Sequence, residues 1–169
     1  VRVAGDEINE SIATYLKKVH NLVVGERTAE EIKIKIGSAF PSNEFDLQSI
    51  DVRGLHLLSG LPRSINLKAG DLREAMSEPL NKIVDAVKRT LERTPPELAA
   101  DIVDRGIMLA GGGALVRGIS DLLSHETGIF THVAEDPLLC VVNGCGKVLD
   151  DFKSMRRVLD TPDFARNVI

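Results

Sequence analysis

Several patterns that define common protein classes are scarce or missing in this sequence. Its 169 residues include two cysteines, one tyrosine, five phenylalanines and no tryptophan. The longest uninterrupted apolar run, residues 138–142, is far shorter than the roughly 20 residues of a membrane-spanning helix. We expect no secretory signal peptide, because no charged and apolar leader pattern opens the chain. These absences give no indication of a membrane-spanning or secreted protein.

The charge pattern and the cysteine spacing exclude further classes. The net charge is −4, and no basic block exceeds Arg156-Arg157, so we expect no nucleic-acid partner. Cys140 and Cys145 match neither a redox pair nor half a zinc site, which favours a reduced cytoplasmic protein. The first residue is Val1 rather than methionine, so we expect a piece of a longer protein or a processed product.

What is present is an ordinary globular composition, with 43% hydrophobic and 27% charged residues. Such a chain forms one domain or two small ones. The composition changes near residues 70–76, where we expect a subdomain boundary. Residues 1–75 then hold a strand tail at residues 1–3, two short helices and a hairpin, and residues 76–150 form a helix-rich α/β unit. Residues 151–169 are a polar tail that we expect to be partly disordered.

Local motifs predict the ends of the elements in the first part. Asp6 is expected to cap a helix over residues 8–19. Thr28 and Glu31 fit a capping box at the start of a second helix. Residues 45–52 alternate imperfectly, which indicates a strand with a bulge, and residues 64–67 indicate an antiparallel partner.

In the second part, prolines and glycines mark the expected boundaries. Pro79 predicts an interruption of the helix near residues 77–79. Thr94 is expected to cap the next helix, with prolines in its first turn. Asp136-Pro137 predicts the start of a later helix. Its glycines Gly144 and Gly146 each cost roughly 1 kcal/mol against alanine, so we expect them to pack closely on a neighbour.

The most distinctive stretch is residues 106–115. Apolar residues 107–110 predict a buried strand, three glycines follow, and helical spacing begins at Leu115. Without Cβ atoms, such a turn lets backbone approach a flat ligand, and the helix start offers unpaired N–H groups. The same pattern also fits an ordinary α/β turn in which glycine serves packing alone.

Known nucleotide motifs match this stretch only in part. No Lys-Ser or Lys-Thr pair follows Gly113, so the turn is not a P-loop. Gly111 and Gly113 fit a dinucleotide fingerprint, and Glu135 resembles its ribose-binding acid, but Val116 stands where the third small residue belongs.

Other candidate groups likewise allow both a functional and a purely structural interpretation. Glu30 and Lys33 share a helix face and could hydrogen-bond a ribose or an adenine edge, or form a solvated face. We find no nucleophile with a base partner. The histidines, none with metal-ligand spacing, are His20, His56, His125 and His132.

Five blocks of sequence together resemble the MreB family of bacterial actin homologues, the rod shape-determining proteins. They are residues 3–7, 25–33, 95–98, 104–115 and 134–138, and the resemblance runs from Val1 to about Leu149. It implies an actin-like ATPase fold, an α/β fold of the RNase H-like type, of which this chain is most of the second domain. Residues 1–75 would form its inserted α+β outer subdomain, and residues 76–150 the C-terminal part of the larger subdomain.

The resemblance implies an ATP site in a cleft between two domains. This chain would supply the adenosine-side contacts, namely Glu30, Glu31, Ile32, Lys33, Gly111, Gly112, Gly113, Ala114 and Leu115. The phosphate-binding loops and the aspartate that holds Mg²⁺ would precede Val1, so we expect no catalytic residue and no metal ligand here and no ATP hydrolysis by this chain alone. Of the family's five-stranded sheet, only the last two strands, near 106–110 and 131–134, would remain.

The function implied is that of a filament-forming, ATP-binding cytoskeletal protein that organises cell-wall synthesis under the inner membrane. Its subunits would stack head to tail. Partners would be cell-wall synthesis and membrane morphogenesis proteins, with membrane attachment through the absent domain. Two alternatives remain: a chaperone-type or division-protein ATPase of the same fold, and a fragment of a dinucleotide-dependent oxidoreductase. Residues 28–33 and 95–97 favour the MreB branch.

Overall fold

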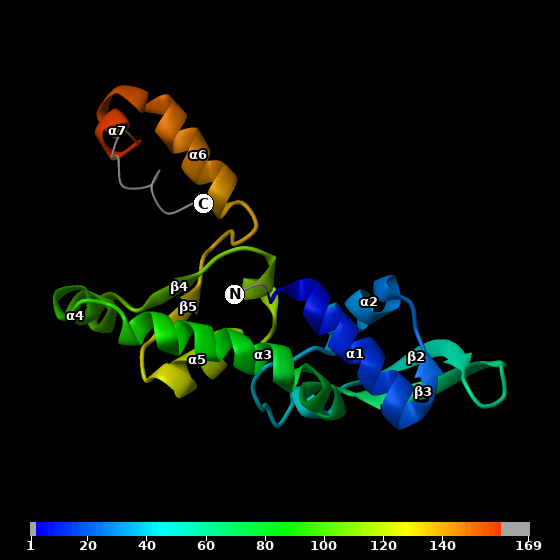
Figure 1. Cartoon of the computed structure of the whole chain (residues 1–169). Helices are drawn as coiled ribbons and strands as arrows, with labels where there is room; N and C mark the ends of the chain where they lie inside the picture. The colour runs from blue at the N-terminus through cyan, green and yellow to red at the C-terminus, as the bar shows by residue number, and fades with distance from the viewer. Residues whose placement is uncertain (1–2, 160–169) are drawn as a thin grey trace.

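The elements of residues 3–159, the part of the chain that this computed structural model describes, form two groups joined by one long helix (Figure 1). The outer group comprises α1 (Gly5–His20), β1 (Leu22–Val23), α2 (Glu26–Ile36), the 3-10 helix η1 (Phe45–Leu47), β2 (Ser49–His56) and β3 (Pro62–Lys68). Helix α3 (Ala69–Glu92) leads to the inner group, which comprises α4 (Pro96–Arg105), β4 (Ile107–Leu109), the 3-10 helix η2 (Gly112–Leu115), α5 (Ile119–Thr127) and β5 (Thr131–Val133).

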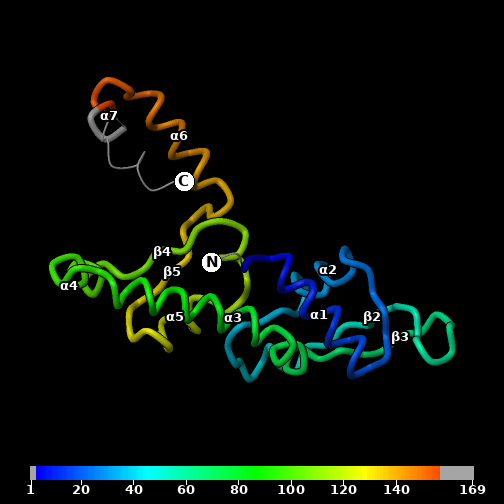
Figure 2. Tube along the Cα trace, in the orientation of Figure 1, coloured from blue at the N-terminus to red at the C-terminus, as the bar shows by residue number. Residues whose placement is uncertain are grey.

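Two further helices, α6 (Cys140–Asp150) and α7 (Phe152–Leu159), end the described chain. They project away from both groups (Figure 2), and no residue of α6 is buried. The close packing expected at Gly144 and Gly146 is not found, because no described atom lies within 4 Å of a Cβ built at either position. Of the tail that is expected to be partly disordered, residues 152–159 are helical, whereas residues 160–169 lie outside the described part, as do residues 1–2 of the expected strand tail. Among residues 3–159, no helix is long and apolar enough to cross a membrane.

Each group contains a small sheet. In the outer group, β1, β2 and β3 are antiparallel, and the hairpin runs from Ser49 opposite Lys68 to Leu55 opposite Pro62, which confirms the expected pairing. Residues 45–47 form a 3-10 turn rather than the start of that strand. In the inner group, β4 and β5 are parallel, with Ile107 opposite Thr131. The expectation that β4 is buried is wrong: Met108 is 64% exposed, because β5 alone pairs with this strand among the described residues.

The main core lies where α1, α2 and α3 pack against the outer sheet. Apolar residues recur every three or four positions along α1 and bury one face of that helix. Ile12 and Leu16 from α1 and Leu72 and Met76 from α3 are completely buried. This packing fixes the start of α1 beside α2 and α3, where the site described below is found.

Three expected caps are wrong, each because the helix begins elsewhere. α2 begins at Glu26, so Thr28 lies inside it, and Glu31 accepts from Arg27 Nε at 3.5 Å instead of capping. α1 begins at Gly5, which leaves Asp6 in the first turn, where an acid stabilises the helix without a capping bond. α4 begins at Pro96, and the Thr94 hydroxyl instead donates to the Thr90 carbonyl.

The interruption expected at Pro79 is also wrong, since α3 is continuous from Ala69 to Glu92. A proline inside a helix leaves the carbonyl four residues earlier without its N–H partner. Here that carbonyl belongs to Ala75, and the hydroxyl of Ser11 from α1 donates to it at 2.6 Å. The neighbouring helix therefore supplies the hydrogen bond that Pro79 cannot, while the proline ring itself is buried.

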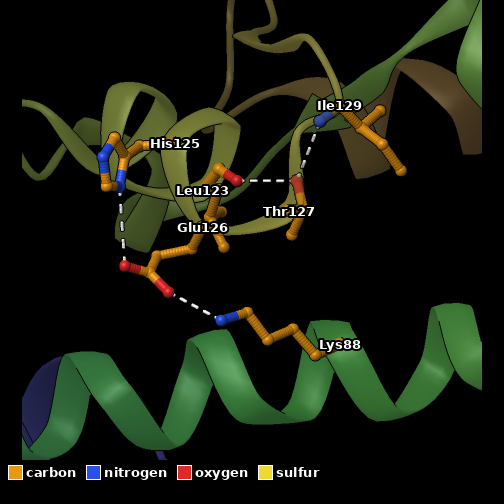
Figure 3. A network of polar contacts seen from close by, with 6 residues as sticks. All are labelled: Lys88, Leu123, His125, Glu126, Thr127 and Ile129. Atoms are coloured by element: carbon orange, nitrogen blue, oxygen red, sulfur yellow. Dashed lines mark hydrogen bonds and ion pairs between the residues drawn. The ribbon is translucent and has the colours of Figure 1, made fainter.

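A polar network ties α3 to the end of α5 (Figure 3). Lys88 Nζ lies 2.6 Å from Glu126 Oε2, and His125 Nδ1 lies 3.5 Å from Glu126 Oε1. The Thr127 hydroxyl donates to the Leu123 carbonyl at 2.7 Å and accepts from the Ile129 N–H at 3.2 Å. Through the Lys88–Glu126 pair, the network connects α5 of the inner group to the long helix.

The Lys88 contact predicts an acid-dependent stability. The hydrogen bond from Lys88, with its charge, lowers the pKa of the Glu126 carboxyl. A lowered pKa means that this stabilisation is present above the ordinary carboxyl pKa and is lost as the pH falls through the folded-state value. We expect Glu126→Gln to lower the melting temperature near about pH 7, with the difference shrinking toward about pH 3. Thermal unfolding of both proteins against pH measures this; Glu135→Gln, an exposed carboxyl outside the helices and without an ion pair among the described residues, should show no such pattern.

Candidate functional site

A cavity of about 780 Å³ lies where the start of α1, the outer face of α2 and the glycine turn meet. Its size falls within the about 300–1,000 Å³ typical of small-molecule sites. The walls are mostly apolar, with a few polar groups, and come from segments far apart in the sequence: Val3, Ala4, Gly5, Asp6 and Ile8; Glu30, Lys33, Ile34 and Gly37; Leu80 and Ile83; Leu109, Ala110 and residues 112–117; Ile119, Leu123 and Leu138.

The structure brings six of the nine expected site residues to this cavity. They are Glu30 and Lys33 from α2 and Gly112, Gly113, Ala114 and Leu115 from the glycine turn. Glu30 and Lys33 are one helical turn apart and therefore share a face.

The other three expected residues do not line the cavity. Ile32 faces the core and is 2% exposed, and Glu31 points to solvent beside Arg27. Gly111 supports the turn instead: its N–H donates to the Pro137 carbonyl at 2.7 Å. That contact also accounts for the late start of α6 at Cys140, because residues 136–139 form the turn that meets Gly111 rather than the helix expected there.

Lys33 connects α2 to the start of α1. Its Nζ donates to the Gly5 carbonyl at 3.2 Å, and a Cβ added at Gly5 would lie 3.1 Å from this nitrogen. The small residue at position 5 thus makes room for the ammonium group. An ammonium carries three N–H groups, so two remain for water or a ligand in the cavity.

The glycine turn differs from the strand-to-helix turn that its sequence predicts. The chain leaves β4 through Gly111, whose φ of 84° suits glycine, and enters the 3-10 helix η2. Helix α5 begins only at Ile119, after Gly118 with φ of 72°. The α-helix that the sequence places at Leu115 therefore begins only after η2, at Ile119, and the turn lines the cavity with residues 112–117.

Local packing does not require the two glycines that line the cavity. A Cβ at Gly113 would meet no described atom within 4 Å, and one at Gly112 would touch only Leu138 Cδ2 at an ordinary 3.6 Å. Packing glycines look different: at Gly118 a Cβ would lie 2.9 Å from Phe40 Cβ. The missing side chains at 112 and 113 keep the cavity open, which favours a ligand role for the turn over a packing role.

Arg117 is a cavity residue that the sequence did not indicate. Its guanidinium carbon lies 3.6 Å from the centre of the Phe45 ring, a cation–π contact. Its carbonyl accepts from the Ala39 N–H at 2.7 Å, and Ser38 pairs with it in a parallel bridge. All these partners are more than 70 positions away, so no local motif could reveal the contact.

Comparison with solved structures defines the class. The fold matches MreB5 of Spiroplasma citri bound to AMPPNP with a TM-score of 0.86 and 33% identity, over 93% of this chain and 46% of that chain. The double helical filament of MamK matches with a TM-score of 0.73 at 18% identity, over 88% of this chain and 45% of that chain, which shows the fold alone. The expected α/β fold is confirmed: the chain has the actin-like ATPase fold.

Sequence comparison then gives the family. The profile of the MreB/Mbl protein family matches residues 1–157. The cell shape-determining protein MreB of Escherichia coli K12 is 49% identical over 150 residues, which are 89% of this chain and 43% of that protein. Mbl of Bacillus subtilis is 44% identical over 155 residues, covering 92% of this chain and 46% of that protein. The chain belongs to the MreB/Mbl family, as its sequence blocks indicated, and spans less than half the length of these relatives.

Proposed function

We propose that this chain forms the adenosine-side wall of an ATP site in a filament-forming, actin-like cytoskeletal protein that maintains cell shape. The observation that carries the proposal is the cavity in which Glu30 and Lys33 of α2 lie with the glycine turn. Support comes from two structures of one relative, MreB5 of Spiroplasma citri, bound to AMPPNP and to ADP and matched at 33% and 32% identity. Of the nine expected contacts, the proposed ones are those that line the cavity, namely Glu30, Lys33, Gly112, Gly113, Ala114 and Leu115, whereas Glu31, Ile32 and Gly111 would flank them without touching the ligand.

The chemistry of the cavity suits an adenosine. The Glu30 carboxylate can accept hydrogen bonds from ribose hydroxyls or from the amino group of adenine, and the Lys33 ammonium can donate to ring nitrogens. The bare backbone of Gly112 and Gly113 lets a flat base lie close, and apolar walls such as Leu138 exclude water from its faces. Phosphoryl transfer needs metal and charged groups on the phosphates, which residues outside this chain would supply. This chain alone is therefore proposed to be inactive as an ATPase.

The assembly and cellular role are part of the same proposal. Residues 1–75 would be the outer subdomain, residues 76–150 the C-terminal part of the larger subdomain and residues 151–169 a tail. Subunits would add head to tail, a contact that continues into filaments rather than closing. The filament would lie in the cytoplasm at the inner membrane and organise cell-wall synthesis through morphogenesis proteins. The names of the relatives, cell shape-determining proteins, support this role.

The decisive experiment uses a chimera in which this chain replaces the matching part of Escherichia coli MreB. We expect the chimera to bind ATP, to pellet with ATP as filaments visible by electron microscopy, and to restore rod shape to cells that lack MreB. Intact MreB is the positive control. A folded chimera that binds no ATP or forms no filaments contradicts the proposal. Phosphate release by the isolated chain above the buffer rate would contradict the assignment of hydrolysis to residues outside it.

A further inference from the structure

The cavity of about 780 Å³ has walls from both groups of elements. Helix α2 of the outer group supplies Glu30, Lys33, Ile34 and Gly37, and the inner group supplies residues 112–117. The placement of one group against the other therefore sets the distance between these two walls. A ligand that touches both walls is bound well only if they are held within about 0.5 Å of the productive geometry.

The two walls are joined at Arg117. Helix α2 ends at Ile36, and the chain continues through Gly37, which lines the cavity. Directly after it, Ser38 pairs with Arg117 in a parallel bridge, and the Ala39 N–H donates to the Arg117 carbonyl at 2.7 Å. Because Gly37 and Arg117 both line the cavity, this joint lies at its edge, where the outer wall meets the inner one.

The side chain of Arg117 extends the joint into the outer group. Its guanidinium carbon lies 3.6 Å from the centre of the Phe45 ring. Phe45 is 6% exposed and belongs to the main core, and the next residue, Asp46, forms an ion pair with Arg73 of α3. The ring is thus a fixed point of the outer group. A guanidinium stacked on it holds the inner wall at a set distance from α2.

The fold does not depend on this side chain. Arg117 is exposed, and within residues 3–159 its guanidinium forms no ion pair and no hydrogen bond. Ile119 and Leu123 of α5 are buried in the main core, so they attach the inner group to the outer group without it. A side chain that the fold does not need, but that lies where both walls meet, is placed to serve the site.

We propose that Arg117 is a positioning residue of the nucleotide site, whose stack on Phe45 sets the separation between α2 and the glycine turn. The proposal rests on the proposed function. A nucleotide that contacts both walls favours the arrangement in which the stack is formed, so the nucleotide and the stack strengthen each other by the same factor. The free energy of the stack is therefore the upper limit of what Arg117 adds to nucleotide affinity.

The first test measures nucleotide affinity in the chimera with Escherichia coli MreB. Arg117→Gln removes the stack and leaves the backbone joint in place. We expect it to bind ATP about three- to tenfold more weakly, the range that a cation–π contact supplies. Adenosine, which carries no charge, should lose affinity by the same factor. A loss confined to ATP would show that Arg117 only attracts the phosphates, and would overturn the positioning role.

The second test separates positioning from direct contact. Phe45→Leu removes the ring and keeps the guanidinium, so it should weaken ATP binding as much as Arg117→Gln does, and the double variant should lose little more. A loss in Arg117→Gln without one in Phe45→Leu would mean that the guanidinium itself touches the nucleotide, which overturns the proposal. Arg93→Gln, at an exposed arginine that does not line the cavity, is the matched control and should bind ATP normally.

The third test reads the wall separation directly and needs no nucleotide. Spin labels are attached to Lys35→Cys on α2 and Asp121→Cys on α5, two exposed positions, in the chain that also carries Cys140→Ser and Cys145→Ser. Pulsed electron paramagnetic resonance should give a narrow distance distribution in this parent and a broader one after Arg117→Gln. A side chain that only stabilises the fold would lower the melting temperature and leave the distance unchanged. Identical distributions would overturn the proposal.

Failure of the proposed function gives a different result from failure of this inference. If the parent chimera binds no ATP, the nucleotide role of Arg117 falls with the proposed function, while the distance distribution still broadens after Arg117→Gln. If the parent chimera binds ATP and Arg117→Gln binds it equally tightly, the positioning role alone is overturned.

Discussion

Replacing Gly112 with valine is expected to reduce ATP binding by the chimera with Escherichia coli MreB at least about tenfold, which corresponds to a loss of about 1.4 kcal/mol. The backbone at this position lines the cavity of about 780 Å³, and the new side chain would extend into the space proposed for the base. The fold should tolerate the change, because the added Cβ meets only Leu138 Cδ2 at 3.6 Å. Titration with a fluorescent ATP analogue gives the affinity, and circular dichroism checks the fold.

Gly144→Val is the matched control for this prediction. Gly144 lies in the exposed helix α6, where an added Cβ meets no described atom within 4 Å, and it does not line the cavity. This variant should bind ATP as the parent does. If Gly112→Val also binds ATP normally, the glycines are a conformational feature of the turn, and the adenosine contact assigned to them is wrong.

Replacing Ser11 with alanine is expected to lower the free energy of unfolding by about 1–3 kcal/mol, although a single hydroxyl is removed. The Ser11 hydroxyl is the donor that serves the Ala75 carbonyl, which Pro79 leaves without a helical partner. Without Ser11, this part-buried carbonyl has no donor. For a chain of this length, each 1 kcal/mol lowers the melting temperature by about 2–4 °C, which thermal unfolding resolves.

A double-mutant cycle shows whether the proline is the cause. In the background Pro79→Ala, residue 79 regains an N–H that can reach the Ala75 carbonyl within the helix, so Ser11→Ala should cost much less there. Ser77→Ala removes a hydroxyl that bonds only within α3, to the Glu74 carbonyl at 2.8 Å, and should change stability little in either background. Equal costs of Ser11→Ala with and without Pro79 would contradict the account.

Local sequence patterns predicted those elements whose partners are close in the chain. The hairpin of β2 and β3 follows from two alternating runs separated by a short turn, and β4 follows from an apolar run that ends at the glycine turn. The resemblance to the MreB family supplied the fold, and it pointed to Glu30 and Lys33 together with the glycine turn, which the structure brings to one cavity.

The sequence predictions were wrong where a residue distant in the sequence, or the residues just before a motif, determine where a helix begins or continues. Pro79 predicts a helix break. The helix continues because Ser11, which lies 64 positions before Ala75 in the sequence, donates a hydrogen bond to the Ala75 carbonyl. Thr28 fits a capping box, but α2 begins at Glu26, directly after Gly25, so Thr28 lies inside the helix. Asn9 of α1 is buried, and its Oδ1 has no hydrogen-bond partner among the described atoms, which no sequence signal indicates, because burial and pairing appear only in three dimensions.

The contact of Arg117 with Phe45 has a mechanical consequence. A single helix such as α3 would let the outer and inner groups rotate about its axis. Arg117 adds a second attachment beside it, through its carbonyl on Ala39 and its guanidinium on the Phe45 ring. An attachment away from the axis resists torsion, as does the packing of Ile119 and Leu123 from α5 in the main core, and the Arg117 attachment lies at a residue that also lines the cavity of about 780 Å³. A molecule that displaced Arg117 would lower the torsional stiffness between the two groups.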